Sequence, residues 1–204
     1  MATLYESYIT GDDGNIVPYG VYYRAQMFTP SVAHTITSVK LLLYRLTTPG
    51  TLTISIRATD GDGKPTGSDL CSGTTSGDTL PTASPYEWRE ITLGNGTLLL
   101  ANIKYAIVAA NPDGDGQSEA IYWRTDASSP TYTGGSLVSS SDSGVTWGAP
   151  DTTRDMMFYD YGDPPAAIAL TLNNRSLEMT LALRSPSMTL NNRSLEMTLP
   201  VGRI

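Results

Sequence analysis

Apolar and polar residues alternate along much of this chain. In residues 51–58, for example, Leu52, Ile54 and Ile56 alternate with Thr, Ser and Arg. A period of two predicts a β-strand with one apolar face. The other segments that pattern and composition predict as strands are residues 4–9, 21–28, 35–46, 86–93, 98–100, 104–110, 120–125 and 154–159.

Turn-forming residues separate these segments. Residues 59–69 read TDGDGKPTGSD, in which Gly permits positive φ and Asp caps its own backbone. Helix formers are sparse, while Thr, Ser, Gly, Tyr and Val dominate. The sequence therefore predicts an all-β fold, with an antiparallel β-sandwich or jelly roll over residues 1–162.

The C-terminal part repeats itself. Residues 171–181 and 189–199 both read TLNNRSLEMTL, and a finer period of nine places Arg175, Arg184 and Arg193 in register. The preceding GDPPAA contains two prolines, which lack an N–H and hold the chain extended. We therefore expect a linker at residues 163–167 and a tail of repeated strands at residues 168–204.

The tail has short alternating apolar sets separated by NNRS and RSPS turns. In an up-and-down meander, one pair of strands with its two turns spans 18 residues, so the NNRS turns lie at one end of the sheet and the RSPS turn at the other. This arrangement explains why the identical sequence recurs after 18 residues. The alternative is extended strands donated to a neighbour. Strands this short are only marginally stable by themselves, so the apolar face of the tail must be buried against its own sandwich, other copies of the chain or another protein. The predicted assembly interface comprises Leu170, Leu172, Leu177, Met179, Leu181, Leu183, Met188, Leu190, Leu195, Met197, Leu199, Arg175, Arg184 and Arg193.

Charge is divided unevenly over the 204 residues, whose net charge is -7. Residues 1–165 carry 9 basic and 18 acidic side chains (-9), and residues 166–204 carry 4 and 2 (+2). An acidic body argues against nucleic-acid binding. No window approaches the roughly 18 apolar residues of a membrane span, and the start lacks a signal-peptide pattern, so we expect no membrane partner.

The candidates for catalysis are isolated. The single histidine, His34, has no GxSxG or similar nucleophile context, and the single cysteine, Cys71, excludes an internal disulfide. We therefore predict that the protein is not an enzyme. Asn111, Asp113 and Asp115 match the opening of a calcium loop, but position twelve is Tyr122 and only Glu119 offers a later carboxylate. The expectation is an acidic turn without a cofactor, with calcium as the alternative.

Two further features concern Trp and Tyr. The segment 140–147, SSDSGVTW, resembles the Asp-box hairpin of sialidases and other β-proteins, which implies structural roles for Asp142, Gly144 and Trp147. A single copy without an arginine cluster argues against glycosidase activity. Exposed aromatic rings on a sandwich can stack on sugars, which makes glycans alternative partners. The candidates are Tyr22, Tyr23, Tyr86, Trp88, Tyr122, Trp123 and Tyr132.

The segments RAQMFTPSVAHTITSVKLLLYR, GTLTISIRATDGDGKPTG, WREITL, KYAIVAA, YWRTD and SDSGVTW follow one another over residues 24–147. This succession resembles the β-sandwich modules of phage structural proteins and of some bacterial surface proteins. The tail is similar to C-terminal strand arrays of virus-encoded proteins. The resemblance implies a virion or extracellular structural protein that self-associates, or joins other virion proteins, in a particle or filament. The alternative is a carbohydrate-binding module of a surface or receptor-binding protein.

Overall fold

The computed structural model describes residues 2–165, 171–173, 176–179 and 188–190. The chain divides into two compact units, Met1–Pro165 and Ala166–Ile204. The first unit is built of strands and one 3-10 turn, η1 (Gly77–Thr79). Within the described residues, no helix has the length and apolar character needed to cross a membrane.

Twelve strands form the first unit within the described residues. They are β1 (Thr3–Tyr8), β2 (Gly14–Ile16), β3 (Tyr23–Phe28), β4 (His34–Leu46), β5 (Thr51–Thr59), β6 (Pro65–Ser76), β7 (Glu87–Leu99), β8 (Tyr105–Ala110), β9 (Ala120–Asp126), β10 (Leu137–Ser140), β11 (Asp155–Met156) and β12 (Phe158–Asp163).

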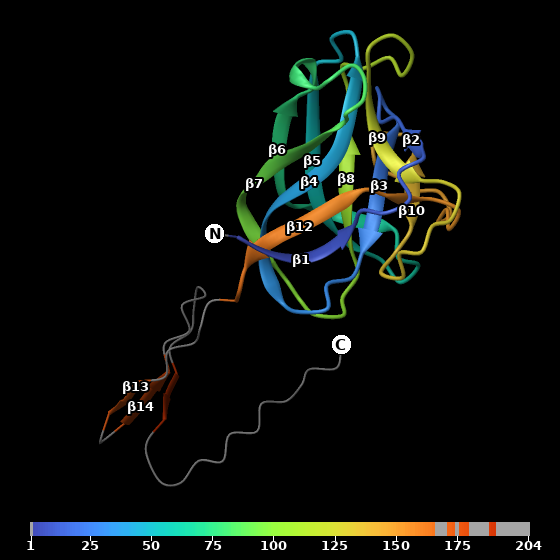
Figure 1. Ribbon diagram of the computed structural model, residues 1–204. Coiled ribbons are helices and arrows are strands. Elements are labelled where there is room, and N and C mark those ends of the chain that lie inside the picture. Colours follow the sequence, from blue (N-terminus) through green and yellow to red (C-terminus); the bar gives the residue numbers. More distant parts are fainter. Residues whose placement is uncertain (1, 166–170, 174–175, 180–187, 191–204) are drawn as a thin grey trace. The chain divides into compact units, whose positions relative to one another are not determined.

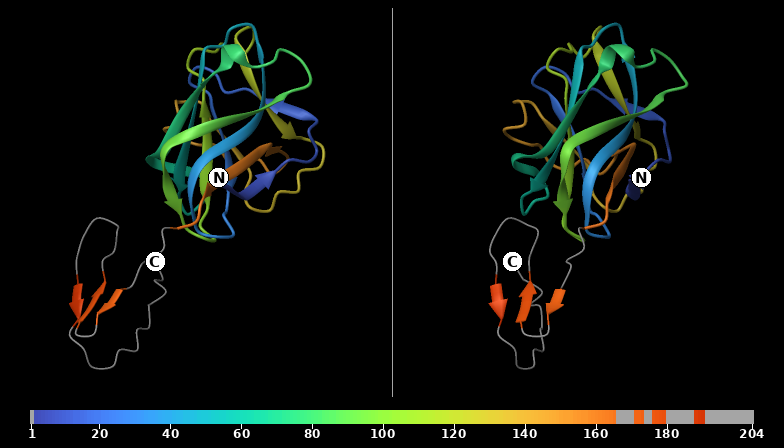
Figure 2. Two further views of the ribbon diagram at one scale, coloured as in Figure 1. Left: turned by 60° about the vertical axis from the view of Figure 1, so that its left-hand side comes forward. Right: turned by 90° about the vertical axis from the view of Figure 1, so that its left-hand side faces the viewer.

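The strands form two antiparallel sheets that pack as a β-sandwich (Figure 1). The seven-stranded sheet has the order β1-β12-β4-β9-β11, with β2 beside β9 and β7 beside β4. The five-stranded sheet has the order β10-β3-β8-β5-β6. Figure 2 shows the two layers from further sides. The all-β antiparallel sandwich expected from the sequence is confirmed.

Strand β4 is the centre of the seven-stranded sheet. One of its edges pairs with β7 from His34 to Leu43. Its other edge pairs first with β12, up to Leu41, and then with β9 from Leu43 to Leu46. Its 13 residues therefore tie three strands from distant parts of the sequence into one sheet.

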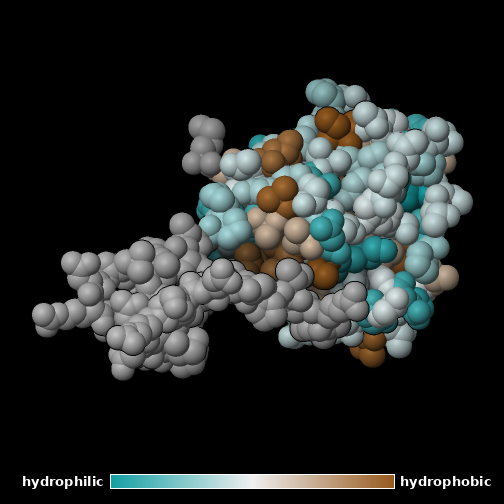
Figure 3. All heavy atoms as spheres, turned by 90° about the horizontal axis from the view of Figure 1, so that it is seen from below, coloured by the Kyte–Doolittle hydropathy of each residue, from teal (hydrophilic) through white to brown (hydrophobic). Residues whose placement is uncertain are grey.

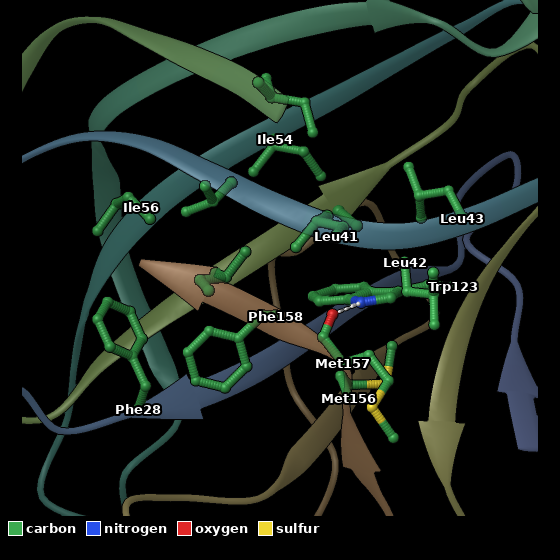
Figure 4. Close-up of a cluster of buried hydrophobic side chains, with 14 of the residues drawn as sticks. Phe28, Leu41, Leu42, Leu43, Ile54, Ile56, Trp123, Met156, Met157 and Phe158 are labelled. Carbon is green, nitrogen blue, oxygen red and sulfur yellow. Dashed lines mark hydrogen bonds between the residues drawn. The ribbon is translucent and has the colours of Figure 1, made fainter. Parts of the chain in front are cut away.

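The core lies between the two sheets, where alternate residues of each strand meet (Figure 4). Trp123 of β9 is fully buried there and donates a hydrogen bond from Nε1 to the carbonyl oxygen of Met157, at 2.8 Å. Figure 4 shows its indole beside Leu42 and the methionines that precede β12, with Phe28 and Phe158 at the other end of the cluster. The indole polar group is thus satisfied inside an apolar core, as burial of a Trp requires.

Two strand assignments from the sequence were wrong. Residues 86–93 and 98–100 were expected as separate strands, but β7 runs through Gly94 and Gly96, both at positive φ, with a bulge opposite in β4. Residues 59–69 were expected to be a turn throughout, but β6 begins at Pro65 and continues to Ser76. Strand β6 lies at the edge of its sheet and is mostly exposed, so it lacks the apolar alternation on which the prediction relied.

The described residues of the second unit form a small antiparallel sheet of three strands, β13 (Thr171–Asn173), β14 (Ser176–Met179) and β15 (Met188–Leu190). Leu177 is the register partner of both Leu172 and Leu190. The remaining predicted interface positions, which include most of the second repeat, lie outside the described residues. They are Leu170, Arg175, Leu181, Leu183, Arg184, Arg193, Leu195, Met197 and Leu199.

Candidate functional site

A pocket of about 380 Å³ lies at the β10 edge of the five-stranded sheet. One wall is a tight turn in which Tyr19 and Tyr22 exchange backbone hydrogen bonds of 3.0 and 2.7 Å. The other wall is the loop that follows β10, and the Ser143 N–H joins the two walls by donating to the Val21 carbonyl oxygen at 2.9 Å. The residues that line the pocket are Tyr22, Arg24, Ser139, Ser140, Ser141, Thr146, Trp147 and Gly148.

The loop after β10 is held by Asp142. Its carboxylate accepts hydrogen bonds from the Ser140 hydroxyl at 2.7 Å and from the Thr146 N–H at 2.9 Å, and Ser140 accepts in turn from the Gly144 N–H at 2.9 Å. The hydrogen bonds from the Thr146 hydroxyl and N–H, followed by that from Ser140, lower the pKa of Asp142 to about 2. Gly144 has φ +78°, a conformation that favours glycine. These hydrogen bonds hold the loop that forms this wall of the pocket.

Trp147 lines the same pocket and is nearly buried. Its ring packs against a second apolar cluster on the outer face of the five-stranded sheet, formed with Ala25, Met27, Ala106, Val108 and Val138. The side chain is 9% exposed, and its Nε1 has no hydrogen-bond partner among the described residues. A buried donor left without a partner costs about 1–3 kcal/mol.

Arg24 is the charged residue of the pocket. Burial lowers the pKa of its guanidinium because the cation is partly removed from water. Its Nη1 donates to the Tyr23 carbonyl oxygen at 3.3 Å, while its Nε is buried without a partner within the described part of the chain. The guanidinium also lies 6.0 Å from the centroid of the Tyr22 ring. Arg24 is therefore a half-buried cation that forms no ion pair with an acidic side chain of the described residues.

A second, smaller pocket of about 140 Å³ provides a contrast. It also contains an arginine, Arg57, but there the guanidinium pairs with Asp69 at 2.6 Å and donates to the Gly144 carbonyl oxygen at 3.1 Å. Its charge is compensated within the protein. Of the two pockets, the one at Arg24 is the better candidate for a ligand.

The outer face of the seven-stranded sheet carries several aromatic residues that pack against one another. Tyr44 stacks on Tyr122 with centroids 4.5 Å apart and on Tyr86 at 4.8 Å, and Arg124 covers Tyr86 at 4.5 Å. Trp88 makes an edge contact with a neighbouring tyrosine at 4.6 Å. The Tyr44 stack therefore engages the ring faces that would otherwise serve as a flat sugar platform.

The other aromatic candidates lie elsewhere. Trp123 is in the core, Tyr132 packs against it, and Tyr23 packs against the Trp147 cluster. Tyr22 is 38% exposed and lies at the pocket of Arg24. The ring of Tyr22 also packs against that of Tyr19, with centroids 4.6 Å apart. The sequence identifies these tyrosines and tryptophans, but it does not show that Tyr22 is the one that stays partly exposed beside the Arg24 cation.

His34 is fully buried in a polar pair with Asp160. Its Nε2 lies 3.0 and 2.9 Å from the two carboxylate oxygens of Asp160, its Nδ1 lies 3.0 Å from the Val32 carbonyl oxygen, and its ring stacks on Tyr5 at 3.8 Å. Burial acts to lower the pKa of His34, but the hydrogen bonds to Asp160 and Val32 outweigh it, so the net shift is upward. Both ring nitrogens face acceptors, which indicates a protonated imidazole.

The acidic loop after β8 is held together by its own backbone. Asp115 accepts N–H hydrogen bonds from Gln117, Ser118 and Glu119 at 2.8 to 2.9 Å, and Asn111 accepts one from Gly114 at 3.1 Å. The Ser118 hydroxyl and these N–H groups lower the pKa of Asp115 to about 2. The Asp113 carboxylate instead faces the Thr51 N–H, at 3.4 Å. Within the described residues, no three His, Cys, Asp or Glu side chains gather as metal ligands.

An apolar patch lies at one end of the sandwich, on the face seen in Figure 3. It comprises Val32 of the β3–β4 loop, Leu98 of β7, and Leu100 and Ile103 of the β7–β8 loop, which are 44–56% exposed. The Asn102 N–H donates to the Pro30 carbonyl oxygen at 2.7 Å and joins the two loops. Strand β12 ends at the same place, because Thr35 is the register partner of both Asp163 and Leu98.

No protein-family model matches this chain, and a search of curated proteins finds no match at the threshold applied.

Proposed function

We propose that this protein is a non-enzymatic structural subunit of a phage or virus particle, or of a filament, that self-associates through its tail and displays the sandwich outward. The observation that carries this proposal is the recurrence of TLNNRSLEMTL at residues 171–181 and 189–199. An identical run of eleven residues indicates a structural unit that is used more than once.

The dimensions of the tail strands support association. Strands β13, β14 and β15 have only three or four residues each, and so small a sheet is marginally stable in water without further burial. Open strand edges and regularly placed Leu and Met residues favour addition of strands from another chain. The tail carries +2 and the body -9, so a tail is also electrostatically suited to the body of a neighbour.

In the proposed assembly, the tail of one chain covers the apolar patch on the sandwich of the next. Four neighbouring apolar side chains, each about half exposed, form a patch of the kind that marks interaction sites. Strand β12, the last strand of the first unit, ends beside this patch.

The first test removes or alters the tail. Deleting residues 164–204 should reduce the assembly to a monomer in multi-angle light scattering. Replacing Leu177 and Leu195 by Asp should do the same, whereas the matched control of Glu178→Gln with Glu196→Gln should leave the size unchanged. An assembly that survives the deletion would refute the proposal.

The second test alters the patch. Leu98→Ser combined with Leu100→Ser should raise the concentration needed for association at least tenfold. Leu70→Ser is a suitable control because Leu70 is 42% exposed, like Leu98 at 44%, but lies on β6. Equal effects of the patch and control variants would show that the tail does not bind this surface.

A second candidate function is carbohydrate binding by a surface or receptor-binding protein. The exposed ring of Tyr22 beside a pocket of about 380 Å³ favours it, because sugar sites combine an aromatic face with polar groups. A glycan array should then show binding that Tyr22→Ala abolishes and that deletion of residues 164–204 leaves intact. An array without signal for the full chain would refute this second candidate.

A further inference from the structure

We infer that the pocket between Tyr22, Arg24 and Trp147 binds a sugar that carries a carboxylate group. The inference rests on the second candidate function and specifies its ligand class. The central residue is Arg24, which forms no ion pair with an acidic side chain in the part of the chain that the structure describes.

The guanidinium of Arg24 is suited to bind an anionic hydrogen-bond acceptor. Within the described part of the chain it donates one long hydrogen bond, to the Tyr23 carbonyl oxygen, and its Nε has no partner. The planar guanidinium matches a carboxylate because it can donate two parallel hydrogen bonds to the two oxygens. Trp147, whose buried Nε1 is a second donor without a described partner, also lines this pocket.

The rest of the pocket indicates a sugar ring. Tyr22 is 38% exposed and contributes an aromatic ring that packs against the Tyr19 ring at 4.6 Å, and its backbone is fixed by the tight turn with Tyr19. Ser139 and Ser141 add hydroxyls that no other described side chain engages, and these can donate to and accept from sugar hydroxyls. A volume of about 380 Å³ lies in the range typical of small-ligand pockets.

The charge around the pocket argues for one carboxylate and against a polyanion. Residues 1–165 carry a net charge of -9, which repels highly charged chains. Asp142, the carboxylate nearest to the lining residues in sequence, accepts three hydrogen bonds from Ser140 and Thr146 and so does not compete for Arg24. A uronic acid, with one carboxylate on a sugar ring, has the chemistry that fits.

Calorimetric titration of the full chain with two disaccharides tests the inference. Cellobiouronic acid and cellobiose differ by one carboxylate, and we expect the acid to bind at least tenfold more tightly. Arg24→Gln should abolish this preference, Arg24→Lys should keep part of it, and Tyr22→Ala should weaken both sugars. Lys104→Gln, which removes an exposed cation from another loop, is the matched control and should have no effect.

The outcomes separate the inference from the function on which it rests. Equal binding of both disaccharides, lost in Tyr22→Ala but kept in Arg24→Gln, would preserve carbohydrate binding and overturn the carboxylate. Binding of neither sugar by a folded protein would overturn both. A glutamate-rich peptide that binds as tightly as the acidic sugar, and depends on Arg24, would assign the pocket to a protein partner instead. The urea midpoint of each variant establishes that it remains folded.

Discussion

Replacing His34 by Phe should destabilise the protein far more than the size of the change suggests. Phe keeps an aromatic ring against Tyr5, so the main loss is the partner of Asp160. Asp160 is fully buried, and its two oxygens lie 2.9 and 3.0 Å from the histidine nitrogen. Removing one member of a buried ion pair typically costs about 3–5 kcal/mol, because the other charge stays buried and unpaired.

This loss of stability should largely disappear when both His34 and Asp160 are replaced. Asp160→Leu alone leaves a buried imidazole that can become neutral, which we expect to cost about 1–3 kcal/mol. His34→Phe with Asp160→Leu removes both polar groups, and such double replacements are often close to neutral. The double variant should therefore be more stable than His34→Phe alone, with a coupling of at least about 2 kcal/mol.

Urea unfolding followed by tryptophan fluorescence measures these differences. For a domain of this size, about 3–5 kcal/mol corresponds to a fall in Tm of roughly 10 °C. Burial raises the folded-state pKa of Asp160, and the hydrogen bond from His34 opposes that shift. In His34→Phe the pKa of Asp160 should therefore rise more, so the variant loses stability as pH rises above the unfolded pKa of about 4. Effects of the two single variants that add to within about 0.5 kcal/mol would refute the ion-pair reasoning.

Three further predictions concern other parts of the sandwich. A Cβ at Gly73 would lie 1.9 Å from the Thr92 carbonyl oxygen, so Gly73→Ala should lower the free energy of unfolding, measured by urea titration, by about 3 kcal/mol. Gly61 lies in open space, so the control Gly61→Ala should change the free energy of unfolding by less than about 0.5 kcal/mol. Hydrogen bonds lower the pKa of Asp142 to about 2, so its stabilising contribution is present above the unfolded pKa of about 4 and is lost as pH falls toward 2. Asp142→Asn should therefore flatten the dependence of Tm on pH in this range. An unchanged profile would contradict the lowered pKa of Asp142. Burial, together with the negative charges of Asp69 and Asp160, raises the pKa of the Cys71 thiol to about 12. Iodoacetamide at pH 8 should therefore alkylate Cys71 slowly in the native protein and quickly in urea. Equal rates would contradict the raised pKa.

The sequence predicts the buried strands well because burial leaves a pattern. Strand β5 alternates fully, and β4 carries a long apolar run, so both were found close to their observed bounds. Strand β6 has mostly exposed Thr, Ser and Gly, and its pairing with β5 rather than its own composition makes it a strand. The continuity of β7 depends on the bulge between β7 and β4, which the sequence of β7 alone does not contain.

The candidate site was harder to predict because its parts are distant in sequence. Arg24 and Ser139 come together through the pairing of β3 with β10, and β10 was not among the expected strands. The Asp-box resemblance identified Asp142 and Trp147 as structural, and it gave no reason to look for a cation beside them. Arg24 has no motif around it, so only its geometry distinguishes it from the paired Arg57.

The position of β12 determines how the sandwich bears mechanical load. Its hydrogen bonds to β1 on one side and β4 on the other run across the strand, and the chain leaves it directly toward the tail. A pull on the tail against the body therefore shears both ladders at once, the direction in which paired strands resist separation most. A pull between the tail and the N-terminus acts differently, because Thr3 lies opposite Gly162 and the two strands separate from that end pair by pair. The sandwich should be strong when anchored through its body and weak when stretched between its own ends.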